Sequence, residues 1–208
     1  MANYTHEQIL AMLGTYIPPK NNEEVDDYLE TVESTPASFD ARTQWSSCVH
    51  PIRDQGQCGS CWAFGSTEAF SDRFCIASSG KIQVVLSPED LVSCDTTDYG
   101  CSGGYLNMAW NYLQNTGAVL DSCFPYGASS GTAPACQAKC SDGSAWKKYK
   151  CSSNSVVHPK TVDAIKTEIY NNGPVEGAFT VYADFMNYKS GVYHLSLIHI
   201  SEPTRLRR

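Results

Sequence analysis

Cysteine is the residue that most constrains the fold of this chain, because ten cysteines are spread over its 208 residues. A chain of this length buries enough surface to fold without crosslinks, so its cysteines are not explained by the need of very small domains for disulfides. They are typical of a protein that folds in an oxidising compartment, where disulfides form and persist. Hydrophobic residues make up 42% and charged residues 18%, which is the composition of a globular protein and not of a disordered one.

The charge balance excludes two classes of partner. The formal net charge is −7, and an acidic surface repels both nucleic acid and anionic membranes. In addition, no apolar run approaches the roughly 18 residues that a membrane-spanning helix needs. We therefore expect neither a nucleic-acid partner nor a membrane partner.

Residues 1–34 differ from the rest of the chain because they contain no cysteine and carry an acidic run. Thr5 and Gln8 stand three residues apart ahead of apolar positions, which is the capping-box pattern and predicts a short amphipathic helix. The tandem prolines at 18–19 are expected to end it. The chain begins without the basic and apolar regions of a signal peptide. Either the protein is cytosolic with reduced cysteines or its natural N-terminus lies upstream, and we favour the second interpretation.

Several segments carry the signals of helices. Ser60 is expected to cap a helix from 61 to about 78, and the sequence Ser-Pro-Glu-Asp beginning at Ser87 starts another. From Tyr105 onward, large and apolar residues follow the spacing of one helix face, which predicts a core-facing helix. A further helix is expected over 162–170.

Residues 175–181 alternate between larger apolar and smaller or polar side chains, which predicts a strand. Helices come first and the strand comes late, so we expect an α+β architecture whose β part has barely started. The last fourteen residues, 195–208, contain three arginines against one glutamate and show neither alternation nor a clear turn signal. They are expected to be an unrelated tail.

Residues 54–64 read DQGQCGSCWAF and carry the strongest chemical signal. Cys61 is expected in the first turn of a helix, where unpaired backbone N–H groups favour the nucleophilic thiolate. The Gln55 side-chain amide could donate a hydrogen bond to a developing oxyanion, together with the backbone N–H of Cys61. Gly59 lacks a side chain and would let a substrate backbone approach closely. This stretch therefore predicts a nucleophilic cysteine.

The motif resembles the nucleophile region of the papain-like cysteine proteases, and other segments are similar to the cathepsin B branch of that family. These segments are PASFDAR at 36–42, CSGGY at 101–105, NGPVEGAF at 172–179 and YKSGVY at 188–193. In the family they correspond to the mature N-terminus, the glycine segment that pairs with the substrate backbone, and the start of the β-rich half. The resemblance covers residues 8 to 193.

The resemblance implies a two-lobed papain-like fold, with the helical left lobe complete and the β-rich right lobe only begun. It divides the chain into the C-terminal part of a propeptide (1–34), a partial peptidase domain (35–194) and the unrelated tail. It implies a cysteine endopeptidase that needs no cofactor and no metal. The expected partners are peptide or protein substrates, the chain's own propeptide and cystatin-like inhibitors. The expected location is a lysosome, a digestive vacuole or the extracellular space.

The family's roles are carried over residue by residue. Cys61 would be the nucleophile, and Gln55 would help to form the oxyanion hole. Substrate binding would fall to Gly59, Trp62, Gly103, Gly104, Tyr105 and Ala178. Among these, the glycines would hold the substrate backbone, while Tyr105 and Ala178 would line the pocket for the second residue before the scissile bond.

The family's pairing pattern also implies four disulfides, which are Cys48–Cys75, Cys58–Cys101, Cys94–Cys136 and Cys123–Cys140. This pairing leaves Cys61 free and gives Cys151 no partner.

The catalytic histidine and asparagine of the family are not evident in this chain. The family places them about 130 to 150 residues after the nucleophile, a window that contains His194 and His199. Neither has the expected neighbours, since the family histidine stands between Gly and Ala and an Asn-Ser-Trp segment follows it. We therefore expect the chain to leave the family pattern after Tyr193 or His194, and to be inactive as written.

A second departure from the family concerns specificity. Cathepsin B carries an inserted loop with paired histidines that blocks one end of the cleft and makes the enzyme a carboxydipeptidase. Between Cys123 and Cys140 this chain has no histidine and little room for such a loop. Endopeptidase activity is therefore the hypothesis for the intact enzyme.

The same residues allow three other interpretations. Cys58 and Cys61 form a CxxC pair, which is also found in thioredoxin-like oxidoreductases and in zinc sites. No preceding βαβ pattern supports the first, and no second CxxC or nearby histidine completes the four ligands of the second. A third alternative is a non-catalytic pseudoenzyme or peptide-binding decoy, because the nucleophile stands without its base.

Overall fold

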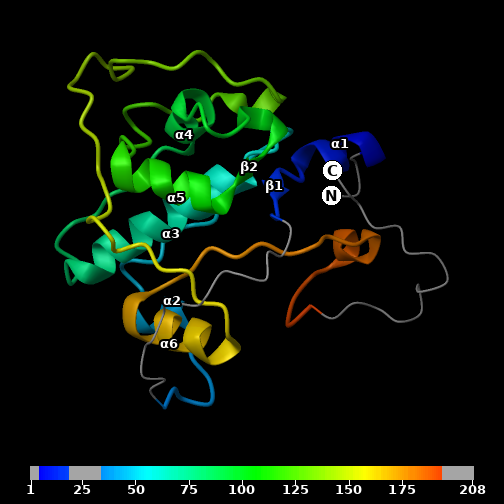
Figure 1. The fold of residues 1–208 in the computed structure, drawn as a ribbon, viewed down its shortest axis with the longest axis vertical. Coiled ribbons are helices and arrows are strands. Elements are labelled where there is room, and N and C mark those ends of the chain that lie inside the picture. The colour runs from blue at the N-terminus through cyan, green and yellow to red at the C-terminus, as the bar shows by residue number, and fades with distance from the viewer. Residues whose placement is uncertain (1–4, 19–33, 194–208) are drawn as a thin grey trace.

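Helices form the body of the molecule in the computed structural model, which describes residues 5–18 and 34–193. The expected tail at 195–208 lies outside these residues, as do His194 and His199. The described elements are α1 (His6–Met12), β1 (Thr15–Tyr16), α2 (Ala41–Gln44), α3 (Cys61–Ala77), α4 (Pro88–Cys94), η1 (Gly100–Ser102), β2 (Gly104–Tyr105), α5 (Leu106–Asn115), η2 (Ala128–Ser130), α6 (Val162–Asn172) and η3 (Ala183–Asn187). In Figure 1, α3 lies behind α5 in the middle of the molecule, and α2 and α6 gather at the end opposite α4.

The core surrounds α3, because apolar side chains reach it from α4, α5 and the loops between them. Trp62, Leu91 and Leu113 are each fully buried there. On α5, Ala109 and Leu113 face the core as the spacing predicts, but Met108 remains 36% exposed. Tyr105 belongs to β2 and not to the helix, so the predicted helix begins one residue later.

Helix α4 forms as its start signal predicts. The Ser87 hydroxyl accepts a hydrogen bond from Asp90 N, and Pro88 occupies the first turn. Glu89 and Asp90 are fully buried, which is costly unless their charges are paired or hydrogen-bonded. Glu89 accepts hydrogen bonds from two backbone N–H groups of the 124–139 segment, and Asp90 pairs with Lys148.

The structure contains the four disulfides that the resemblance implies, namely Cys48–Cys75, Cys58–Cys101, Cys94–Cys136 and Cys123–Cys140. Cys61 and Cys151 are free. Three of the bridges tie α3, η1 and α4 to the loops around them, and the fourth, Cys123–Cys140, joins two loop positions. The sequence separations of the bridged cysteines run from 17 to 43 residues.

The stretch after α6 differs from the sequence expectation. Residues 175–181 run without a strand, where alternation predicts one. Arg73 of α3 holds the start of this stretch by donating to the carbonyl oxygens of Gly173 and Pro174. A strand needs a neighbour that accepts and donates along its edge, and the described residues supply none beside 175–181.

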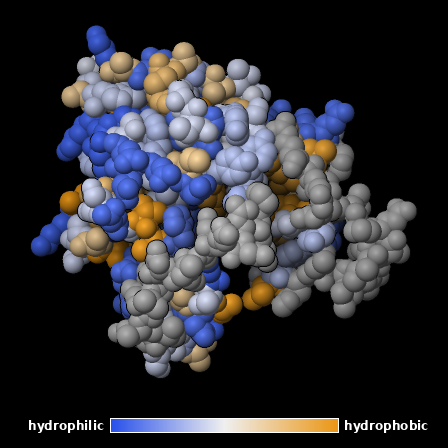
Figure 2. All heavy atoms as spheres, viewed as in Figure 1, coloured by the Kyte–Doolittle hydropathy of each residue, from blue (hydrophilic) through white to orange (hydrophobic). Residues whose placement is uncertain are grey.

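The only sheet in the described residues has two strands, β1 and β2, which run parallel with Thr15 opposite Gly104. Figure 1 shows β1 beside β2, next to the start of α5. Capping at Thr5 and Gln8 starts α1 as predicted, but α1 ends at Met12, well before the tandem prolines. Figure 2 shows hydrophilic residues over much of the visible face, with apolar residues in separate groups between them. No helix in residues 5–18 and 34–193 is long and apolar enough to cross a membrane.

Candidate active site

The first residue of α3 is Cys61, so its thiol lies where unpaired amide N–H groups give the helix end partial positive charge. The loop before it, residues 54–60, is fixed at several points. Asp54 accepts from Gly56 N, the disulfide of Cys58 reaches η1, and Gly59 N donates to Cys101 O. The position of the candidate nucleophile is therefore set by a helix on one side and a crosslinked loop on the other.

Ser60 does not cap α3 with its side chain, contrary to the sequence expectation. Its hydroxyl instead lies 2.8 Å from the hydroxyl of Tyr126, which comes from the 124–139 segment. The sequence pattern for a cap is local and does not contain this competing partner, 66 residues away.

The side-chain amide of Gln55 points toward the N-terminal segment, defined here as residues 5–18. Its Nε2 donates to Met12 O at 2.8 Å and to Cys58 O at 2.9 Å. Gln55 lies in the loop that precedes Cys61, and two backbone carbonyls already accept hydrogen bonds from its side-chain amide. This is the contact that an amide in an oxyanion hole would make with a carbonyl oxygen.

Residues 103–105, called the wall below, pair with the part of the N-terminal segment that reaches the thiol. Gly104 N donates to Gly14 O at 2.7 Å, which starts the β1–β2 pairing. Gly103 has a φ of +118° and lies against Gly14 and Tyr16, so a side chain here would be strained and would collide with the N-terminal segment.

The N-terminal segment lies directly over Cys61. Thr15 Oγ1 is 3.1 Å from Cys61 Sγ, and Gly14 packs on Gly59 so closely that a Cβ on Gly14 would lie 1.8 Å from Gly59 O. Tyr16 contacts the rings of Tyr99 and Tyr105 and donates its hydroxyl proton to Ser102 O. Sequence reasoning did not predict the contact of Thr15 with Cys61, because nothing local marks a residue that meets a thiol 46 positions later.

Two expected substrate-binding residues are not at this surface. Trp62 is fully buried, with Nε1 donating to Gly100 O, so it supports the wall from behind. Its ring lies under Gly104, where an added Cβ would approach it to 2.5 Å. Ala178 lies exposed on the stretch after α6, and no described contact joins it to Cys61.

His50 and His158 do not contact the thiol in the described contacts. His50 Nδ1 lies 2.6 Å from Asp72 Oδ1, and His158 is exposed. Among the described side chains, the hydrogen-bond partner of Cys61 Sγ is the Thr15 hydroxyl. In the same ranges, no cluster of three or more His, Cys, Asp or Glu residues could hold a metal ion.

Two buried carboxyls lie in the scaffold, Asp98 against Gly104 and Glu176 against Gly65 of α3, and sequence reasoning missed both. Asp98 Oδ1 accepts from Tyr105 N at 2.7 Å, and burial raises the pKa of Asp98 to about 6. Glu176 Oε2 accepts from Trp110 Nε1 at 2.7 Å, and burial raises the pKa of Glu176 to about 8. An isolated acid in a loop carries no pattern that predicts its burial.

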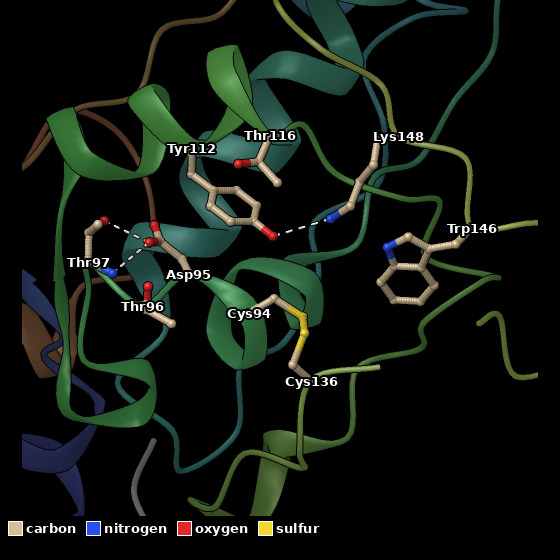
Figure 3. Close-up of a pocket in the computed structure, with 9 residues that line it drawn as sticks. All are labelled: Cys94, Asp95, Thr96, Thr97, Tyr112, Thr116, Cys136, Trp146 and Lys148. Carbon is tan, nitrogen blue, oxygen red and sulfur yellow. Dashed lines mark hydrogen bonds between the residues drawn. A yellow bond between two sulfur atoms is a disulfide. The ribbon is translucent and has the colours of Figure 1, made fainter. Parts of the chain in front are cut away.

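A separate hollow of about 420 Å³ lies away from Cys61 (Figure 3). Tyr112, Lys148, Trp146 and the Cys94–Cys136 disulfide line it, and the ammonium group of Lys148 points toward the Tyr112 hydroxyl. The hollow includes neither the thiol nor the Gln55 amide. The convergence of nucleophile, amide donor and backbone-binding wall is therefore at Cys61 and not at this hollow.

The sequence model for "Papain family cysteine protease" matches residues 35–204. Cathepsin B-like cysteine proteinase 3 of Caenorhabditis elegans is 42% identical over 185 residues, which covers 78% of this chain and 50% of that protein. Cathepsin B-like CP3 of Giardia intestinalis is 43% identical over 166 residues, which covers 78% of this chain and 56% of the relative. The chain spans about half the length of these relatives.

Among solved structures, procathepsin B S9 from Trypanosoma congolense is similar with a TM-score of 0.80 and 32% sequence identity. The similarity covers 94% of this chain and 70% of that one. Procathepsin L2 from the larval midgut of Tenebrio molitor is similar over 64% of this chain, with a TM-score of 0.54. Both of these structures are proenzymes.

Proposed function

Because the chain belongs to the papain family of cysteine proteases and is cathepsin B-like, we propose that Cys61 is the nucleophile of a peptidase that works through an acyl-enzyme. The papain-like fold expected from the resemblance is confirmed by the same comparisons. The observation that carries the proposal is the arrangement around Met12–Thr15, where a carbonyl oxygen meets the Gln55 amide and a hydroxyl meets the thiol.

The mechanism follows from this arrangement. A substrate peptide would lie along Gly103 and Gly104, where its backbone replaces that of Gly14. The Cys61 thiolate would attack the carbonyl carbon, and the oxyanion would accept hydrogen bonds from Gln55 Nε2 and Cys61 N. A histidine would protonate the leaving amine, and water would then release the acyl group from the sulfur.

The N-terminal segment acts in this proposal as a prosegment that holds the enzyme inactive. Three features support this role, namely the β1–β2 pairing, the Thr15 contact with the thiol and the use of the Gln55 donor by Met12. The substrates are peptides or proteins, and cystatin-like inhibitors are the expected external ligands of the same cleft. We place the protein in an acidic compartment, a lysosome or a digestive vacuole, or outside the cell.

Endopeptidase action is the specificity we propose. The 124–139 segment contains no histidine. Its contacts include those of Ser129 and Tyr126 with the 54–60 loop, those with Glu89 of α4, and the Cys94–Cys136 disulfide. These contacts hold the segment against the 54–60 loop and α4. Mature enzyme carrying this cleft should cut an unfolded protein at internal bonds, and release of C-terminal dipeptides alone would contradict the proposal.

The test of the nucleophile uses the 208-residue chain and a Cys61→Ser variant. Because the Thr15 hydroxyl meets the thiol and no described histidine side chain contacts it, dipeptidyl fluorogenic substrates should show negligible turnover by both proteins. Iodoacetamide should label Cys61 ahead of Cys151, because burial raises the pKa of the Cys151 thiol to about 11. Preferential labelling of Cys151 would count against Cys61 as the nucleophile. Turnover that the Cys61→Ser change abolishes would contradict the inactive state.

A further inference from the structure

One phenolic hydroxyl connects the two ends of the 54–60 loop. Tyr126 Oη donates to Gln55 O at 2.8 Å and also lies 2.8 Å from Ser60 Oγ. Gln55 carries the side-chain amide donor, and Ser60 directly precedes Cys61. The same hydroxyl therefore touches the residue that bears one oxyanion donor and the residue that precedes the other donor, the Cys61 N–H.

Tyr126 is itself held firmly. Its ring meets Phe64 of α3 edge to face, with 4.7 Å between ring centroids. The next two backbone N–H groups, of Gly127 and Ala128, donate to the buried carboxylate of Glu89. Burial raises the pKa of Tyr126 to about 12, so the hydroxyl keeps its proton in any biological pH range.

A second contact from the same segment holds the middle of the loop. Ser129 O accepts from Gln57 N at 2.9 Å. Gly56 has a φ of +62° and packs on Ser129, where an added Cβ would lie 2.4 Å from the carbonyl oxygen. The segment between Cys123 and Cys140 thus supports the loop along its length, and Tyr126 is the part that reaches both of its ends.

The spacing between two oxyanion donors must be accurate, because each acts only within about 2.7 to 3.1 Å of the oxygen that it stabilises. Neither Gln55 nor Ser60 lies in a regular element, so their separation is set by the contacts of the loop. We propose that Tyr126 is a positioning residue of the oxyanion hole, whose hydroxyl fixes the Gln55 side-chain amide relative to the Cys61 backbone N–H. This proposal rests on the proposed function, because it takes Gln55 and Cys61 to form an oxyanion hole. The contacts of Tyr126 with Gln55 and Ser60 do not depend on that function.

The experiment uses hydrogen exchange by NMR in the 208-residue chain, with its N-terminal segment in place. The Gln55 side-chain amide is observed as the reporter, and a Gln55→Glu variant identifies its signals. Gly104 N–H, which donates to Gly14 O, is the internal reference for the seated N-terminal segment. In Tyr126→Phe, the ring contact with Phe64 stays and the two hydroxyl contacts are lost.

Exchange of the Gln55 amide should accelerate about fivefold to tenfold in Tyr126→Phe, as expected for the loss of one or two neutral hydrogen bonds. Exchange at Gly104 should stay within about twofold of the wild type, since the β1–β2 pairing is untouched. Tyr149→Phe is the matched control, because it removes the hydroxyl of a partly buried tyrosine packed on Phe74 and should leave both rates unchanged.

Two results would overturn the proposal. One is an unchanged Gln55 rate in folded Tyr126→Phe, and the other is an equal acceleration at Gly104, which would assign Tyr126 to general stability. If Tyr126→Phe does not fold, Ser60→Ala removes one arm of the bridge and keeps the ring, and a rise of about twofold to fivefold is then expected. An unchanged rate in folded Ser60→Ala also overturns the proposal. No turnover enters the measurement, so a failure of Cys61 as the nucleophile and a failure of Tyr126 give separate results.

Discussion

Gly14 is the residue at which the N-terminal segment packs on the loop that precedes Cys61. It touches Gly59 through backbone alone, and Gly59 in turn packs on Ala11 O and Cys101 O. Two glycines facing each other allow the chain to pass at a distance that any side chain would forbid. This contact brings Met12 O to the Gln55 amide and Thr15 to the thiol, so a single methyl group at Gly14 should disturb both.

We expect Gly14→Ala to expose Cys61. The new Cβ would lie 1.8 Å from Gly59 O, which is backbone and has no flexible end to move, so the segment must lift. Alkylation of Cys61 by iodoacetamide should accelerate by about tenfold or more, equivalent to about 1.4 kcal/mol of lost contact. Gly177→Ala is the matched control, because its Cβ would meet nothing within 4 Å. Equal Cys61 alkylation rates in the two variants would show that the close approach does not hold the segment.

At the residue scale, the sequence predicts the site residues that share one short motif, but not those that meet a partner far along the chain. Cys61 and Gln55 lie in one motif, and the structure places both beside the same segment of backbone. Thr15 and Tyr126 meet their partners across 46 and 66 to 71 residues, so no local pattern contains them. Trp62 belongs to the motif by sequence, yet the fold buries it as support for Gly104.

At the scale of elements, helix starts were predictable because their signals are local. Thr5, Ser87 and Thr161 each accept from the backbone N–H three residues on, which begins α1, α4 and α6. The end of α1 and the missing strand at 175–181 were not predictable in the same way. Both depend on a neighbour, since Gly14 leaves the helix path to pair with Gly104, and 175–181 lacks a described strand beside it.

The contact of α4 with the 146–151 segment depends on one buried ion pair. Asp90 is fully buried, and both of its carboxylate oxygens lie 2.6 Å from Lys148 Nζ. Tyr112 of α5 also donates to Asp90, and burial raises the pKa of the Tyr112 hydroxyl, so it stays a neutral donor. Figure 3 shows the Lys148 ammonium group and the Tyr112 hydroxyl pointing toward each other.

Lys148→Met should therefore lower the free energy of unfolding by about 3 kcal/mol, because a buried carboxylate loses its counter-charge. Urea unfolding with the disulfides intact measures the change. Lys166→Met is the matched control, since Lys166 pairs with Asp163 at 3.8 Å with both side chains largely exposed, and should cost less than about 1 kcal/mol. Similar values for the two variants would mean that burial adds nothing to the pair at Asp90.

At the scale of the whole molecule, four carboxyls with raised pKa values should make the fold less stable as the pH rises. Burial raises the pKa of Glu68 and of Asp121, that of Asp98 to about 6 and that of Glu176 to about 8. The carboxyls with lowered pKa, Asp40 and Asp142, are held by Arg42 and by Ser144 on the exposed surface, where such contacts contribute little. The raised set therefore dominates the pH dependence that these groups give to stability.

The sign follows from proton linkage. A carboxyl with a raised pKa in the folded state keeps its proton after the unfolded chain has released it. Its contribution to stability is complete below the unfolded value, which is 4.5 for Glu176, and is lost as the pH rises through about 8. For Asp98 the corresponding window runs from 3.8 to about 6. The melting temperature should thus be highest near pH 4 to 5 and should fall toward pH 8.

Glu176→Gln separates the upper part of this fall from the rest. Glutamine keeps an acceptor for Trp110 Nε1 and stays neutral, so the variant should lose much less stability than the wild type between pH 6 and pH 8. Thermal unfolding at pH 4.5, 6 and 8 gives the profile, and each kcal/mol corresponds to about 2 to 4 °C in a chain of this size. Glu7→Gln on the exposed face of α1 should follow the wild-type profile. Two outcomes would contradict this prediction. One is a wild-type melting temperature that is highest at pH 8, and the other is a melting temperature of Glu176→Gln that falls as steeply as that of the wild type above pH 6. Either would show that the Glu176 carboxyl does not cause the loss of stability as the pH rises.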